Sequence, residues 1–111
     1  MNTMTINGYQ AVISFDPDIQ MFRGEFVGLN GGADFYAKDV KGLQREGAIS
    51  LKVFLAACAE DGVEPRKRFS GKFSLRVDPA THEAATIAAA AHGQSLNQWA
   101  ANALRQAARA G

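Results

Sequence analysis

Apolar and polar residues alternate strictly over the short segment 72–77, which two helix-like patterns follow. A period of two places neighbouring side chains on opposite faces of a strand. The apolar face would carry Phe73, Leu75 and Val77, and the polar face Lys72, Ser74 and Arg76. A lone strand followed only by helices leaves its backbone N–H and C=O groups unpaired. We therefore predict that the segment pairs with the same segment of a second copy in a two-stranded antiparallel ribbon.

Two short helices are predicted after this segment. Asp78 and Pro79 supply a cap and a first-turn proline, and Gly93 is a natural residue for a helix end. The run Ser95–Gln98 has the pattern of a capping box, which would open the second helix. A unit of roughly 40 residues with few large side chains buries too little surface alone, so we expect two chains to share one core. Its members would be Phe73, Leu75, Val77, Ile87, Leu96, Trp99 and Leu104.

The amino-terminal half has the pattern of a small α+β module. Apolar residues alternate over 9–15, a second strand is expected over 21–27, and residues 35–36 can form a short third strand. A helix would begin at the cap residue Asp39 and end near Gly62. Gly47 lies inside that helix, where glycine costs roughly 1 kcal/mol relative to alanine, so we expect close packing against the sheet there.

Charge is distributed unevenly along the chain, although the formal net charge is only +1. Residues 1–64 hold five basic and nine acidic residues, whereas residues 65–111 hold seven basic and two acidic ones. A basic carboxy-terminal half suits the phosphates of nucleic acid, and an acidic amino-terminal half suits a cationic protein. Two halves of opposite charge indicate two different partners.

Two blocks carry a family resemblance. The runs Phe73–Arg76 and Gly93–Asn97 have the spacing of a ribbon-helix-helix domain of the Arc and MetJ type. The longer runs Ser70–Arg76 and Ser95–Gln98, together with the amino-terminal half, resemble the HicB antitoxins of bacterial toxin–antitoxin pairs. One departure concerns the buried charged triad of Arc-like domains, because the matching positions here are Gln94, Trp99 and Ala103. Apolar residues can replace a buried ion network without loss of the fold.

The resemblance implies a division of labour. Residues 1–64 would form a degenerate ribonuclease-H-like domain that binds a HicA-like, mRNA-cleaving toxin. Residues 65–71 would form a basic linker. Residues 72–111 would dimerise as a ribbon-helix-helix and repress the protein's own operon by binding operator DNA in a bacterial cytoplasm.

The DNA contacts can be predicted by residue. Lys72, Ser74 and Arg76 would reach base edges in the major groove, because a two-stranded ribbon fits that groove. The backbone N–H groups of Ser95, Leu96 and Asn97 would hold a phosphate at the start of the second helix. The basic residues of the linker would either contact phosphates or only keep the linker soluble; they are Arg66, Lys67 and Arg68.

Other functions are less well supported. Asp16, Asp18, Glu25 and Asp34 lie on turns, strand faces and loops, so we expect no metal site, no cofactor and no catalysis. His82 and His92 are too far apart on one helix to share a metal. Three alternatives stay open: a repressor whose amino-terminal module senses a small ligand, a degraded nuclease domain that still binds RNA, and a plain edge strand at 72–77 with a solvated face.

Overall fold

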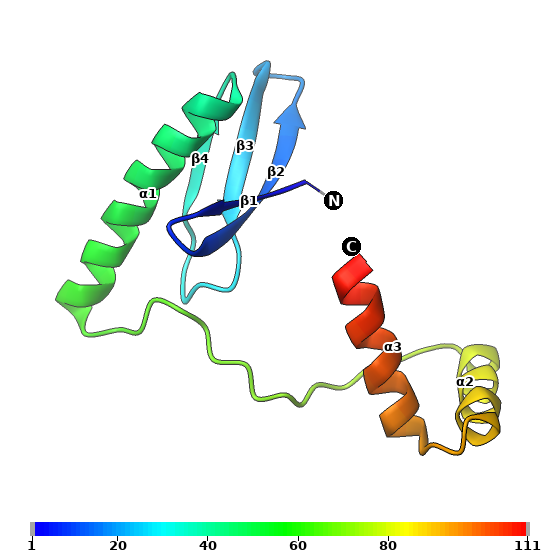
Figure 1. Ribbon diagram of the computed structural model, residues 1–111. Helices are drawn as coiled ribbons and strands as arrows, with labels where there is room; N and C mark the ends of the chain where they lie inside the picture. The colour runs from blue at the N-terminus through cyan, green and yellow to red at the C-terminus, as the bar shows by residue number, and fades with distance from the viewer. Residues whose placement is uncertain (1, 111) are drawn as a thin grey trace. The chain divides into compact units, whose positions relative to one another are not determined.

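The computed structural model describes residues 2–110, and the chain divides into two compact units that meet between Ser70 and Gly71 (Figure 1). The first unit contains β1 (Thr3–Ile6), β2 (Tyr9–Asp16), β3 (Met21–Phe26), β4 (Asp34–Ala37) and α1 (Val40–Asp61). The second unit contains α2 (Pro79–Ala91) and α3 (Leu96–Ala110). The α+β class predicted from the sequence is therefore confirmed.

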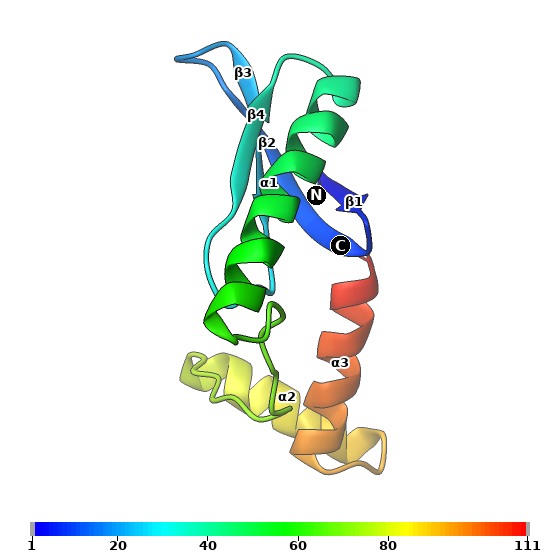
Figure 2. The ribbon, with the colours of Figure 1, turned by 90° about the vertical axis from the view of Figure 1, so that its left-hand side faces the viewer.

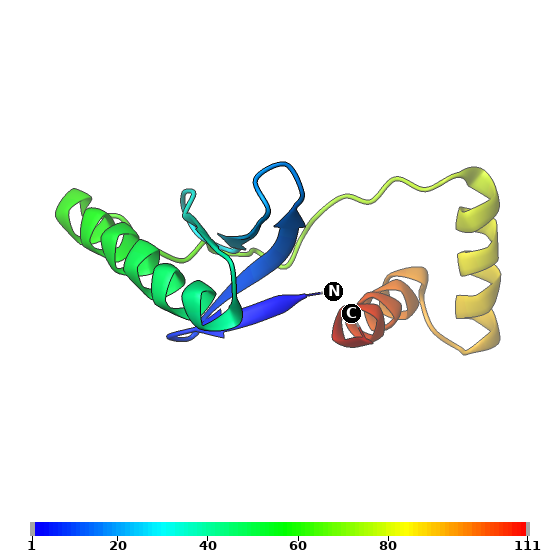
Figure 3. The ribbon, with the colours of Figure 1, turned by 90° about the horizontal axis from the view of Figure 1, so that it is seen from above.

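The first unit is an antiparallel sheet of strand order β1-β2-β3-β4, with α1 lying along one of its faces (Figure 3). Alternation sends every second side chain toward α1, as in the cross-strand pair Ala11 and Phe26. The buried core of this unit comprises Ile6, Ala11, Phe26, Leu29, Phe35, Ala37, Leu43 and Leu51. The three predicted strands are present as β2, β3 and β4, with ends shifted by one residue. The strand β1 was not predicted.

Local capping signals were predicted correctly in both units. The Asp39 carboxylate accepts a hydrogen bond from the N–H of Gly42 at 2.6 Å, and Gly62 ends α1 in the left-handed region with φ of 68°. At the start of α3, the N–H of Gln98 donates to Ser95 Oγ at 3.1 Å and the N–H of Ser95 donates to Gln98 Oε1 at 3.0 Å. This reciprocal pair is the capping box that the sequence predicted.

Residues 72–78 have no secondary structure in the single chain, although the alternation predicted a strand. The reason is physical, since a strand is completed by a hydrogen-bonded neighbour and the predicted neighbour belongs to a second copy. The ribbon and the ribonuclease-H-like character of the first unit stay predictions.

Two glycines make room for core side chains in the first unit. A Cβ on Gly47 would meet Ile6, which explains the glycine inside α1. A Cβ on Gly24 would clash with the ring of Phe35, its direct cross-strand partner on β4, at 2.2 Å from Cζ. The Phe35 ring is 4% exposed and packs at 5.2 Å from the ring of Phe26, so it has no free direction in which to move.

We expect Gly24→Ala to destabilise the first unit by about 1–3 kcal/mol, because overpacking forces the Phe35 ring out of its position. Gln10→Ala, on the exposed side of β2, is the matched control and should leave the unfolding free energy nearly unchanged. Urea unfolding followed by circular dichroism measures both, and equal midpoints for the two variants would contradict this packing argument.

Candidate DNA-binding and partner-binding surfaces

The second unit is almost without an interior. Among residues 71–110, Ala89 is the one buried residue, and α3 contributes none. Phe73 is 72% exposed, Leu75 is 64% exposed and Val77 is 45% exposed. In a single copy these large apolar side chains are therefore in contact with water. Full burial would stabilise each of them by roughly 1.5–3 kcal/mol.

These apolar side chains converge on one feature. An open groove of about 1150 Å³ runs between the extended segment 72–77 and the two helices. Six of the seven residues predicted for the shared core line it, namely Phe73, Leu75, Val77, Leu96, Trp99 and Leu104. Ile87, the seventh, is 62% exposed and does not line the groove. The groove is thus an open surface that most of the residues predicted for the shared core line.

The predicted base-reading residues Lys72, Ser74 and Arg76 are exposed along the same segment and also line the groove, so the single copy does not separate the polar face of the segment from its apolar face. The phosphate site predicted at the start of α3 is altered by the capping box, because the N–H of Ser95 is already bonded to Gln98 Oε1. The N–H groups of Leu96 and Asn97 lie in the first turn, where a helix offers no internal acceptor. The phosphate contact therefore stays a prediction for these two groups.

Arg66 is held against the first unit by contacts that no sequence pattern predicts. Its guanidinium donates to the carbonyl of Gly8 at 3.1 Å and its Cζ lies 3.9 Å from the centre of the Tyr9 ring. Its backbone carbonyl accepts from Asn30 Nδ2 at 3.1 Å. The N–H of Lys67 adds a bond to the carbonyl of Gly28 at 2.9 Å. We call this set of contacts the Arg66 clamp.

The Arg66 clamp involves residues that the sequence analysis placed in the basic linker. Residues 65–67 lie against the loop after β3 rather than between the units, so the connecting segment proper begins at Arg68. An Arg66 side chain that caps Gly8 and covers Tyr9 serves the first unit, and a phosphate contact would have to compete with both interactions. Arg68 is exposed, and its phosphate contact stays a prediction.

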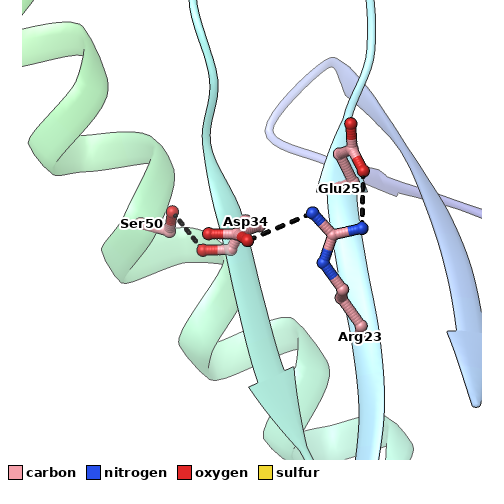
Figure 4. A network of polar contacts seen from close by, with 4 residues as sticks. All are labelled: Arg23, Glu25, Asp34 and Ser50. Atoms are coloured by element: carbon pink, nitrogen blue, oxygen red, sulfur yellow. Dashed lines mark hydrogen bonds and ion pairs between the residues drawn. The ribbon is translucent and has the colours of Figure 1, made fainter. Parts of the chain in front are cut away.

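The sheet face opposite α1 carries a small charged network (Figure 4). Arg23 Nη1 lies 2.7 Å from Glu25 Oε2, and Arg23 Nη2 lies 3.2 Å from Asp34 Oδ2. Hydrogen bonds to Asp34 and Tyr36 raise the pKa of Arg23 above its ordinary value. Ser50 Oγ on α1 donates to the backbone carbonyl of Asp34 at 3.0 Å. Two of the carboxylates considered for a metal site thus face one guanidinium.

No group of three or more potential metal-ligating side chains occurs within residues 2–110. In the same part of the chain, no helix is long and apolar enough to cross a membrane. The uncovered sheet face carries Asp16, Glu25 and Asp34 against one cation, Arg23, so it is acidic and rich in hydroxyl and amide side chains.

The structure therefore has two units, a small α+β module and a helix pair whose large apolar side chains are partly or largely exposed in the single chain. The sequence profile of the HicB family matches residues 54–104, from the second half of α1 to the middle of α3. The match covers slightly less than half of the chain, so over this segment the chain is similar to the HicB family. No curated protein and no solved structure matches the chain.

We expect Arg66→Ala and Arg68→Ala to have different effects. Loss of the Arg66 side chain removes the stacking on Tyr9 and the bond to Gly8, so the backbone amides of Asn30 and Lys67 should exchange hydrogen faster. Arg68→Ala should leave that exchange unchanged and instead lower the salt dependence of DNA binding. Amide exchange and DNA titration at two salt concentrations separate the two roles; identical exchange in both variants would argue against the clamp.

Proposed function

We propose that the protein is an antitoxin that neutralises a HicA-like toxin through its first unit and represses its own operon through its second. The single observation that carries the proposal is the groove of the second unit, lined by apolar residues that one copy leaves in water. The HicB-family match over residues 54–104 includes that groove and supports the same assignment.

A second copy would complete the groove. Antiparallel pairing of segments 72–77 satisfies their backbone groups and turns both sets of apolar side chains toward one interior. The sharing would also cover the exposed Leu104 and the half-buried Trp99 on α3, which would then pack against the partner. One dimerisation step would therefore give the extended segment a hydrogen-bonding neighbour and cover the exposed apolar surface.

The same pairing would build the DNA-reading surface. With the apolar residues turned inward, Lys72, Ser74 and Arg76 of both copies project from the other face of the ribbon. Arg76 can make two hydrogen bonds to a guanine, and Ser74 can donate or accept. The excess of basic residues after position 64 favours approach to phosphates.

The first unit would bind the toxin. Its sheet face opposite α1 carries three carboxylates against one cation, and such a face suits a partner whose RNA-binding face is basic. The same face offers hydroxyls and the Tyr36 side chain, which is 39% exposed. Such a partner would have its RNA-binding surface covered while bound, which is sufficient for neutralisation.

We expect Leu75→Lys to convert the full chain from a dimer to a monomer, because the charge would have to be buried in the shared core. Ser74→Ala, one residue away on the polar face, is the control and should remain dimeric. Sedimentation velocity at micromolar concentration measures both. A wild-type chain that sediments as a monomer would remove the basis of the proposal.

We expect Arg76→Ala to lose preference for the operator by roughly 1–3 kcal/mol at each guanine contact. The variant should still dimerise and still protect cells that express the toxin encoded beside it, since neither activity uses the polar face of the ribbon. Titration of operator and random duplexes, with a growth-rescue assay, tests both parts. Unchanged operator preference would show that the segment is not the reading surface.

A further inference from the structure

The outer face of α1 carries an apolar strip that the sheet does not use. Ile49 is 53% exposed, Val53 is 67% exposed, and Ala56 is also exposed. Their spacing of four and then three residues places them on one side of the helix. Gly47, Leu51 and Cys58, by contrast, are buried in the first unit. Figure 2 shows α1 from its outer side.

Charged residues of opposite sign lie at the two ends of this strip. Arg45 lies one turn before Ile49 and Glu60 lies one turn after Ala56, and both are exposed. The side chain of Arg45 is 68% exposed, and its contact with Glu46 at 3.5 Å is a solvent-screened pair that contributes little. The strip is therefore basic at one end, apolar in the middle and acidic at the other.

We propose that this strip packs against the same strip of a second copy, with the two α1 helices antiparallel. A two-fold axis between positions 52 and 53 brings Arg45 of one copy to Glu60 of the other, and Ile49 to Ala56. Both matches occur twice, as an interface between identical surfaces requires. The small Ala56 leaves space for the larger Ile49. Val53 lies beside the axis, where the same symmetry brings it to the exposed Lys52 of the other copy.

The charges favour this antiparallel arrangement over a parallel one. A parallel pair in the same register would place Arg45 against Arg45 and Glu60 against Glu60, so like charges would repel at both ends. In the antiparallel pair, arginine meets glutamate at both ends, about 22 Å apart along the helix axis. A partner of another sequence has no comparable reason to match the strip at both ends.

The contact is small and its affinity modest, because one helix pair buries less than the roughly 1,200–2,000 Å² of a standard interface. It strengthens wherever another link already holds two copies together. The arrangement does not depend on how residues 71–111 pair, so the two proposals can fail separately. Its role is to join first units, in addition to any joining of second units.

A cysteine placed beside the two-fold axis tests the arrangement in the full chain. Val53→Cys should form a disulfide-linked dimer under a mild oxidant far more readily than Gln44→Cys, which lies on the opposite side of α1 and is equally open to solvent. The native Cys58 is buried and competes little. Yields are read from non-reducing gels, and equal yields for the two variants would overturn the proposal.

Charge reversal tests the register. In the Val53→Cys background, Arg45→Glu alone and Glu60→Arg alone should each lower the yield several-fold, and the two changes together should restore it. Thermal melts confirm that these exposed substitutions leave the fold intact. A double variant that stays as low as the single ones would refute the pairing. Unchanged yields with lost toxin neutralisation would assign the strip to the toxin instead.

Discussion

An extended backbone needs a hydrogen-bonding neighbour, and this requirement governs the second unit. Residues 72–78 carry no regular structure in one copy, and the apolar side chains beside them line an open groove. The hydrogen-bonding neighbour of this segment and the other half of the core would both come from the same surface of a second copy. In the proposed dimer, dimerisation would be part of folding for this unit, and the proposed DNA reading would depend on it.

In the first unit, the strands find their hydrogen-bonding neighbours within one chain. Its four strands pair in sequence order, and α1 covers one face, so the core is complete without a partner. Close fits such as Phe35 over Gly24 fix the register between β3 and β4. The first unit thus has a complete core within one chain, whereas the second unit would share its core with a second copy in the proposed dimer.

The sequence predicted what local chemistry determines. The cap at Asp39, the helix end at Gly62 and the capping box at Ser95 depend on residues only a few positions apart, and all three were confirmed. The strand β1 was missed because four residues give too short an alternation to recognise. The Arg66 clamp could not be predicted, since Arg66 and Gly8 are 58 positions apart and no pattern links them.

The exposed segment 72–78 also affects how long a chain survives. Endoproteases bind their substrates as extended backbone, and cleavage concentrates where a segment is exposed and lacks regular structure. In an unpaired copy this description fits residues 72–78, which include the basic residues Lys72 and Arg76. Pairing would remove the segment from attack, and a cut there would separate the first unit from the proposed DNA-binding unit. The lifetime of the intact protein would then rise with its own concentration.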